Sequence, residues 1–167
     1  MTKLEFKELN LENFDSYVDY IIHSEELYPT QIRSSKEDYK DMLKDENSIA
    51  IVAFSDSEYV GNIVGSPLLD HEFDEYELDK KKKIVYLYNI VVENNYQGRG
   101  LGSKLLKEFI KVAKERGFDT LVGHFRQNRS LALIKKLGCI IKKVHNNWED
   151  SGEDYCFCEL DLKNINF

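Results

Sequence analysis

The chain has 167 residues, of which 42% are hydrophobic and 12% aromatic, and its formal net charge is −7. This length and composition predict a single folded domain over residues 1–167 and exclude a disordered chain. The acidic balance argues against non-specific binding of nucleic acid, and no apolar run approaches the ~20 residues that a membrane helix needs.

The N-terminal part of the chain predicts a strand and then a helix. Residues 4–9 alternate between apolar and polar side chains, as a half-buried strand does. Asn10 or Asn13 offers a helix N-cap, and apolar side chains at helical spacing continue to about Leu27. Pro29 ends this helix, because proline disfavours helical geometry at the residue before it.

The middle of the chain predicts a second helix and three strands. Residues 34–47 have a short apolar face at helical spacing, and residues 48–54 and 58–66 read as two strands joined by a tight turn. Residues 69–82, which are rich in Asp and Glu, are expected to form a loop or a frayed strand extension. Residues 83–92 are apolar on both alternation phases, so we place this strand in the centre of the sheet.

The C-terminal part predicts two helices and three strands. An amphipathic helix covers residues 101–117 and ends at a glycine, residues 119–125 form a strand, and residues 129–138 form a shorter helix. Residues 139–147 and 153–162 are the last two strands. The order β-α-α-β-β-β-α-β-α-β-β predicts the α/β class, with a mixed sheet and helices on both of its faces.

The turn before the amphipathic helix, QGRGLG (97–102), carries three glycines in five residues. Glycine costs roughly 0.5–1 kcal/mol relative to alanine inside regular structure, so this density indicates that another group approaches the backbone closely. Backbone N–H groups at a helix start lack partners, and the helix dipole adds positive charge there. Strand, glycine turn and helix start together predict a phosphate-binding site, with Gln97, Arg99 and Ser103 as further donors.

Two common phosphate-binding patterns do not match this turn. A P-loop needs Gly-x4-Gly-Lys-Ser/Thr, which neither Gly98 nor Gly102 begins. A dinucleotide fingerprint needs Gly-x-Gly-x-x-Gly after a first strand, whereas this chain has Gly-x-Gly-x-Gly after its fourth.

QGRGLG does match Gln/Arg-x-x-Gly-x-Gly/Ala, and it resembles the acyl-CoA pyrophosphate loop of the GNAT (GCN-five-related) N-acetyltransferase superfamily. YLYNIVVENNYQGRGLGSKLL is similar to that family's fourth strand, turn and third helix, and RQNRSLALIKKLGC lies where a later motif belongs. The resemblance covers about residues 3–162. It implies a GNAT-like, mostly antiparallel central sheet and acetyl-CoA as the co-substrate.

The resemblance also implies which residues hold acetyl-CoA. In this family the fourth strand splays from the fifth, and its free backbone groups pair with the pantetheine arm. Asn128 resembles a family asparagine, but it stands one residue beyond the usual slot, which holds Gln127, and a plain helix N-cap is the alternative. The expected cofactor-binding residues are Ile90, Val91, Val92, Gln97, Gly98, Arg99, Gly100, Leu101, Gly102, Ser103 and Asn128.

Four residues are candidates for the chemistry. Transfer to an amine with a pKa near 10.4 requires a base or a water chain, and His124 titrates in the right range. Asn89, a polar residue in an apolar strand, is expected to orient substrate or water, or to be a satisfied buried amide. Tyr86 occupies a position where some relatives carry a catalytic glutamate, and it is expected to line the pocket. Tyr155 is an alternative proton donor, because the slot of the family's usual tyrosine holds Ile134.

The expected reaction is direct attack by a primary amine, on a small molecule or on a protein or peptide, in a ternary complex. The acidic segment 70–79 would attract a cationic acceptor, but the favoured interpretation is a solvated loop neutralised by Lys80 to Lys83. Trp148 is expected in a pocket wall or over the core.

An acyl-CoA-binding module with little or no transferase activity is the alternative function, suggested by Ile134. In the family, four carboxylates would lie in segments beside the acceptor pocket: Glu25, Glu26, Asp70 and Glu72.

The cysteines predict neither a metal site nor a disulfide framework. Cys139, Cys156 and Cys158 make an odd number, and the last two do not have a zinc-ligand spacing. We read them as reduced packing residues of a cytoplasmic protein, and the N-terminus has no apolar segment of signal-peptide length. Dimers are common in the family the chain resembles, so a homodimer is an open alternative.

Overall fold

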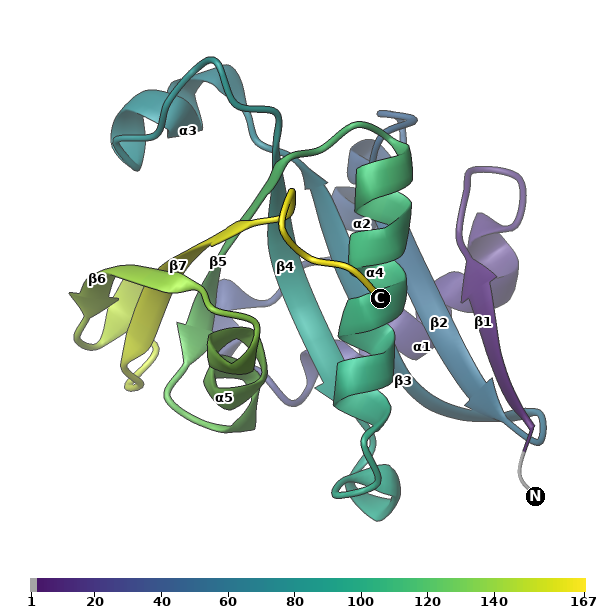
Figure 1. Ribbon diagram of the computed structural model, residues 1–167. Helices are drawn as coiled ribbons and strands as arrows, with labels where there is room; N and C mark the ends of the chain where they lie inside the picture. The colour runs from purple at the N-terminus through teal and green to yellow at the C-terminus, as the bar shows by residue number, and fades with distance from the viewer. Residues whose placement is uncertain (1–2) are drawn as a thin grey trace.

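The computed structural model describes residues 3–167 as one seven-stranded sheet covered by helices (Figure 1). The predicted element order is confirmed, with one further short helix and three 3-10 turns. In chain order the elements are β1 Leu4–Glu8, α1 Phe14–Glu25, η1 Thr30–Ile32, α2 Lys36–Met42, β2 Ile49–Ser55, β3 Glu58–Pro67, α3 Asp70–Glu75, β4 Ile84–Val92, η2 Asn94–Tyr96, α4 Leu101–Glu115, β5 Thr120–Arg126, α5 Arg129–Lys136, β6 Ile140–His145, η3 Trp148–Asp150 and β7 Tyr155–Asp161.

The sheet is mixed and mostly antiparallel, as predicted. Its strand order is β1-β2-β3-β4-β5-β7-β6, and only β4 and β5 run parallel. These two strands pair only from Ile84 to Tyr86 with Thr120 to Val122, although β4 continues to Val92. Beyond Tyr86 the edge of β4 that faces β5 therefore has no strand partner, and the sheet opens there.

Helices cover both faces of the sheet. In Figure 1, α4 and α5 lie in front of the strands, and α1 and α2 lie behind them. The alternation of β2 explains this arrangement, because Ile49 and Ile51 belong to the core beneath α4, whereas Ala50 and Val52 belong to the core with α1 and α2. Strands buried on both faces have the continuous apolar runs seen in β2 and β4.

The bulge in β4 reverses the direction of its side chains at the opening. Val64 of β3 pairs with Asn89 and Gly65 pairs with Leu87, so Tyr88 has no partner across the strand. Before the bulge, Leu87 faces the α4 core; after it, Ile90 faces that core. Asn89 consequently turns toward α1 and α2, and a bulge beside an opening commonly re-aims side chains in this way.

The acidic segment corrects one prediction. Residues 69–82 were expected to form a loop or a strand extension, but Asp70–Glu75 form the short helix α3. The Glu72 carboxylate accepts a hydrogen bond of 3.0 Å from the Leu69 backbone N–H and closes the first turn. In Figure 1, α3 lies beyond the end of the sheet at which β4 begins. A six-residue helix offers too little periodicity to be recognised among the flanking charges.

The predicted cap of α1 is also different in detail. Asn13 does precede the helix, but its side-chain oxygen accepts a hydrogen bond from the Asn10 backbone N–H. The side-chain oxygen of Asn10 in turn accepts a hydrogen bond from the Asn13 backbone N–H. The two asparagines therefore fix the turn before α1, and the Asn13 side chain makes no capping hydrogen bond to the N–H groups of the helix. The helix ends at Glu25, two residues before the predicted end.

The three cysteines are free and pack against the core, as predicted. Within residues 3–167, no group of three or more His, Cys, Asp or Glu side chains is arranged to hold a metal ion. The same part of the chain has no helix with the length and apolar character needed to cross a membrane.

Candidate active site

A cavity of about 1030 Å³ follows β4 along its opening. Side chains from α1, α3, α5 and the segment before β7 form its walls, and the glycine turn closes one end. Fourteen of the fifteen predicted site residues line this cavity. Arg99 is the exception, because its guanidinium lies over the Tyr96 ring, 5.3 Å from the ring centre.

The glycine turn presents open backbone to the cavity. Gly98 and Gly100 both have φ +78°, and a Cβ built on either would meet no heavy atom within 4 Å. Gly100 occupies the N-cap position of the fifteen-residue helix α4, so the unpaired N–H groups of the first turn face this space. Positive φ and free space together are what a backbone anion site requires.

Gly102 has a different role from its two neighbours. A Cβ at this position would lie 2.9 Å from Leu133 Cδ1 on α5. The glycine therefore allows α5 to pack closely against the first turn of α4. This contact lies at the end of the cavity that the glycine turn closes.

Gln97 joins the glycine turn to β4. Its side-chain amide donates to the Val92 carbonyl at 3.0 Å and to Asn94 Oδ1 at 3.2 Å. Arg129 at the start of α5 donates to Gln97 Oε1 at 3.2 Å. The glutamine thus orients the turn and holds Arg129, while Lys136 on the same helix also lines the cavity. This end of the cavity combines cationic side chains with a helix N-terminus.

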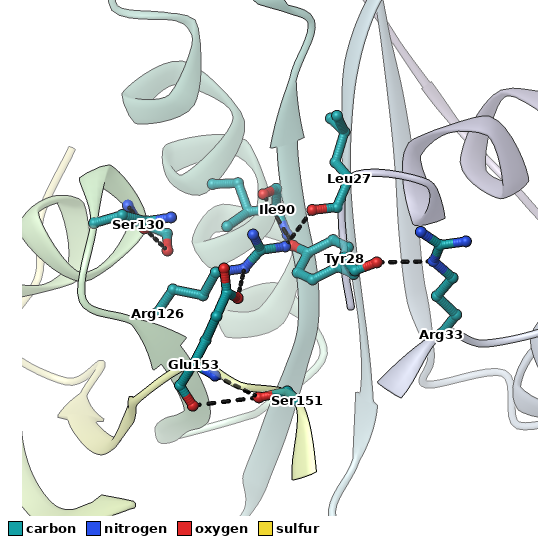
Figure 2. Close-up of polar contacts among 9 residues, drawn as sticks. Leu27, Tyr28, Arg33, Ile90, Arg126, Ser130, Ser151 and Glu153 are labelled. Carbon is teal, nitrogen blue, oxygen red and sulfur yellow. Dashed lines mark hydrogen bonds and ion pairs between the residues drawn. The ribbon is translucent and has the colours of Figure 1, made fainter. Parts of the chain in front are cut away.

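The free edge of β4 is held by a residue that the sequence did not reveal. The Tyr28 hydroxyl lies 3.3 Å from both the N and the O of Ile90, accepting from the N–H and donating to the carbonyl (Figure 2). The Ile90 backbone groups therefore point into the gap between β4 and β5. Burial raises the pKa of Tyr28 above its ordinary value, so the phenol keeps its proton.

Two arginines fix the segment that carries Tyr28. Arg126 donates to the Leu27 carbonyl at 2.6 Å, and its guanidinium lies 4.4 Å from the centre of the Tyr28 ring. Glu153 pairs with Arg126 at 3.5 Å (Figure 2). Arg33 donates to the Tyr28 carbonyl at 2.8 Å. Elements from both ends of the chain thereby place this phenol over the opening of the sheet.

Asn89 belongs to a buried chain of polar side chains. Its carbonyl accepts from Asn62 at 2.7 Å, and its amide donates to the Tyr39 hydroxyl at 3.2 Å and to Glu25 Oε1 at 3.4 Å. Glu25 also accepts from the Tyr39 hydroxyl and, at 2.9 Å, from the Ser34 N–H. Glu25 is only 6% exposed and lines the cavity, so a fully hydrogen-bonded carboxylate lies next to the centre of β4.

His124 and Tyr86 form a hydrogen bond of 2.5 Å between the phenol and Nδ1. Burial, and secondarily His145, lower the pKa of His124 to about 3, so the imidazole is neutral in ordinary buffers. Its ring stacks on Trp148 with centres 4.1 Å apart, and its Nε2 has no hydrogen-bond partner among the described residues. A weakly basic imidazole is a poor acceptor for an amine proton.

Tyr155 faces the same cavity. Its side chain is 2% exposed, and its hydroxyl has no hydrogen-bond partner within residues 3–167. Burial raises the pKa of this phenol, so it too keeps its proton. An unpaired buried hydroxyl costs about 1–3 kcal/mol, which favours a bound polar group or water as its partner.

The residues of α5 divide between cavity and core. Asn128 lines the cavity and caps α5 by accepting from the Ser130 N–H at 2.9 Å, whereas Gln127 points to Cys156 Sγ at 3.7 Å. Asn128 thus serves as the helix cap and also lies in the cavity wall. Ile134 is fully buried in the core beneath α4 and does not line the cavity.

A sheet that splays at β4, an exposed helix N-terminus and one cavity joining them are the features that the resemblance to acyl-CoA-dependent transferases of the GNAT type predicted. A family model described as "Acetyltransferase (GNAT) family" matches residues 13–139. The chain belongs to this family, as the resemblance of QGRGLG predicted.

Two curated relatives share part of the sequence. They are the "Spermine/spermidine N(1)-acetyltransferase" of Bacillus subtilis (strain 168) and the "Probable spermine N(1)-acetyltransferase" of Bacillus subtilis subsp. natto (strain BEST195). Each is 40% identical over 57 residues, which are 34% of this chain and 37% of the relative. The match therefore spans little more than a third of either curated relative.

Solved structures share the whole fold at low sequence identity. Arabidopsis thaliana NAA60, solved in complex with acetyl-CoA, has a TM-score of 0.75 at 14% identity and covers 97% of this chain and 100% of its own. Salmonella typhimurium yncA, solved with its cofactor acetyl-CoA, has a TM-score of 0.71 at 17% identity, with 98% and 96% covered. The similarity confirms the predicted fold.

Proposed function

We propose that this protein is an N-acetyltransferase that moves an acetyl group from acetyl-CoA to a primary amine by direct attack in a ternary complex. The observation that carries the proposal is the single cavity that joins the open glycines at the start of α4 to the unpaired edge of β4. Family membership supports it, and so do the fold relatives solved with acetyl-CoA.

The geometry supports an assignment of the cofactor-binding residues. The backbone from Gly98 to Ser103 would bind the pyrophosphate, with Arg129 and Lys136 as nearby cations. The pantetheine arm of acetyl-CoA would run along Ile90, Val91 and Val92 and would pair with the backbone groups that face the gap between β4 and β5. Tyr28 would have to release the Ile90 N–H for this purpose, because its hydroxyl holds that group in the present structure.

Acetyl-CoA supplies a thioester carbonyl, which the amine nitrogen attacks as the amine loses a proton and the thiolate leaves. The Ile90 N–H would donate to the carbonyl oxygen as negative charge develops on it. Asn89 would orient the amine or a water, and Glu25, which Asn89 contacts, would receive the proton. Tyr155, with a protonated and unpaired hydroxyl, would return a proton to the thiolate.

His124 and Tyr86 enter the proposal as wall residues. The low basicity of His124 makes it a poor proton acceptor, although it was a catalytic candidate from the sequence. Its hydrogen bond to Tyr86 instead fixes two rings of the cavity wall. The two curated relatives are named for spermine or spermidine, and we extend that acceptor class, polyamines, to this chain as a proposal.

The test is a thiol-release assay with acetyl-CoA and a panel of polyamines, amino acids, aminoglycosides and peptide N-termini, together with thermal unfolding. We expect acetyl-CoA to raise the unfolding temperature and at least one polyamine to release free thiol. No thermal shift at millimolar acetyl-CoA would refute the proposed site. A shift without thiol release for any amine would favour the alternative, an acyl-CoA-binding module, which the buried Ile134 supports.

Assembly and location complete the proposal. We propose a homodimer through the edge strand β6, where Ile140, Ile141 and Val144 are exposed apolar side chains. Sedimentation velocity would measure the oligomeric state, and a monomer at micromolar concentration would contradict the proposed dimer.

The three free cysteines support a reducing compartment, and we propose the cytoplasm.

A further inference from the structure

The cavity ends, on the side away from the glycine turn, in a group of aromatic side chains that we call the aromatic end. Tyr86 and Tyr88 come from β4, Tyr76 follows α3, His124 comes from β5 and Trp148 from η3. The Tyr76 and Tyr86 ring centres are 6.2 Å apart, and those of Tyr86 and Tyr88 are 4.7 Å apart. Aromatic rings around a cavity are a known environment for an ammonium group.

A carboxylate without an ion pair stands in the wall of the aromatic end. Glu72 lines the cavity, and within residues 3–167 no Lys, Arg or His lies within salt-bridge distance of it. One of its oxygens accepts from the Leu69 N–H, which leaves the other available. Burial is the main reason why the pKa values of Tyr76, Tyr86 and Tyr88 are raised, and the negative charge of Glu72 adds to the rise for each of the three phenols.

The basic side chains near the aromatic end are either neutral or paired with a carboxylate. Burial lowers the pKa of both His124 and His145, so neither imidazole adds a charge at neutral pH. Lys80 pairs with Asp74 at 2.9 Å, and Lys82 pairs with Glu159 at 3.5 Å.

The cationic side chains of the cavity, by contrast, are Arg126 near its middle and two residues of α5 at the glycine turn. The cavity is therefore electrostatically asymmetric along β4.

Unpaired polar atoms in the same walls point to a ligand. The Tyr155 hydroxyl and His124 Nε2 are buried and find no hydrogen-bond partner in the described part of the chain, and the rings of both residues contact Trp148. Tyr155 is 2% exposed and lines the cavity, so a partner for its hydroxyl has to lie inside the cavity. A polar molecule in the cavity would provide these atoms with a partner.

The aromatic end and the proposed reaction point lie at different positions along β4. Tyr86 and Ile90 are four residues apart on β4, which is at most about 13 Å at ~3.3 Å per residue. An amine that reacts near Ile90 must be neutral, whereas the environment around Glu72 favours a cation. The two positions thus suit two different nitrogen atoms of one extended molecule.

We propose that Glu72, with Tyr76, Tyr88 and Trp148, forms a subsite for the distal ammonium group of an alkyl diamine or polyamine whose other end is acetylated near Ile90. This inference rests on the proposed function and specifies its acceptor. It assigns selectivity for long diamines over monoamines to α3 and η3.

The experiment compares diaminooctane with octylamine, which has the same chain length but no distal nitrogen. We expect kcat/KM to be higher for the diamine, and we expect Glu72→Gln to reduce this preference by about tenfold, the size of one charge-assisted contact. Gln retains an oxygen for the Leu69 N–H, so α3 keeps its first turn. Glu75→Gln is the control, because this exposed residue of α3 does not line the cavity.

Equal kcat/KM values for the two amines would overturn the subsite while leaving the proposed acetyl transfer intact. An equal loss of preference in Glu75→Gln would also overturn it, because the effect would then arise from the general charge of α3.

A binding measurement separates the subsite from catalysis. Trp148 is the sole tryptophan of the chain and lines the aromatic end, so its fluorescence reports on this end directly. We expect diaminooctane to change the emission at lower concentration than octylamine, without acetyl-CoA, and Glu72→Gln to remove the difference. This result would stand even if no amine were acetylated, whereas an unchanged emission with both amines would refute the subsite.

Discussion

At the scale of single residues, the three glycines of the turn perform two separate jobs. Gly98 and Gly100 provide positive φ and open space, whereas Gly102 allows α5 to approach α4. The density of glycines in the sequence predicted an anion site, but the sequence could not show which glycine has which role. That division depends on Leu133, which contacts Gly102 from another helix.

Gly100→Ala is expected to affect both stability and cofactor use. Alanine at φ +78° should cost about 1 kcal/mol of unfolding free energy, and its methyl group would stand where the pyrophosphate approaches. We expect the KM for acetyl-CoA to rise by about tenfold, a loss of ~1.4 kcal/mol in binding. Steady-state kinetics and urea unfolding measure the two effects.

Gly138→Ala is the matched control. Gly138 has φ +90° and equally open space around its Cβ position, but it follows α5 and does not line the cavity. The same stability loss with an unchanged KM is expected. A raised KM in both variants would show that backbone strain, and not the cradle, weakens cofactor binding.

Other residues show which kinds of signal a sequence carries. Asn89 could be singled out because it is the polar exception in an apolar strand, and it lies in the buried polar chain beside the cavity. Tyr28 and Arg126 could not be singled out. Nothing local marks a tyrosine before a proline, and their positions depend on contacts between residues far apart in the chain.

At the scale of elements, α5 determines which residues can reach the cofactor. Its cavity face carries Arg129, Ala132, Leu133 and Lys136, whereas Ile134 is on the core face and 0% exposed. The slot that the family's tyrosine would occupy by sequence therefore belongs to the hydrophobic core in this chain. A helix keeps this division because residues two apart lie on different faces.

Ile134→Tyr should consequently fail to provide a general acid. The larger ring must fit into a filled core, which should cost about 1–3 kcal/mol, and its buried hydroxyl adds a further penalty if it finds no partner. We expect a lower unfolding temperature and no increase in kcat, with Ile134→Val as a mild reference. An increased kcat at unchanged stability would mean that α5 can present position 134 to the cavity.

The elements also differ in how well periodicity predicted them. Long, amphipathic α4 and the apolar strands were predicted within a few residues. The short α3 was missed, and the bulge at Tyr88 was invisible, since a strand that is apolar on both phases gives no sign of a change of face. Both features lie at the aromatic end, where the proposed acceptor specificity resides.

At the scale of the whole molecule, the partly buried, neutral imidazole of His124 links folding to pH. Its pKa is about 3 in the folded protein, chiefly because of burial, against an ordinary value of 6.5. Between these values the unfolded chain binds more protons than the folded one, so stability falls as pH falls through this window. The loss from pH 7 to pH 5 should be about 2 kcal/mol for this one group.

Unfolding by urea at pH 7 and pH 5 measures this dependence. The difference between the two unfolding free energies should shrink in His124→Gln. It should persist in His71→Gln, where the replaced side chain is exposed. The measured quantity is the change in unfolding free energy between pH 7 and pH 5, so a general loss of stability in either variant does not affect it. An unchanged difference in His124→Gln would contradict the assignment to this residue.

The fold as a whole was accessible from the sequence because strand and helix periods, the glycine turn and the element order all agreed with one architecture. The site was predicted most completely where it is built from one continuous segment, from Tyr86 to Ser103, and beyond that segment only single residues such as His124, Asn128 and Tyr155 were predicted. Its other walls come from the ends of α1, α3 and η3, which converge only in three dimensions.

The double hydrogen bond of Tyr28 to Ile90 has a kinetic consequence. The hydroxyl occupies a backbone group that the thioester would need, and it belongs to the segment that forms the acceptor-side wall. Arrival of acetyl-CoA should therefore free that segment before the amine can enter, which gives a compulsory order of substrate addition. Tyr28→Phe should make the order random, as product-inhibition patterns would reveal; random addition in the unsubstituted protein would show that the phenol moves independently of the cofactor.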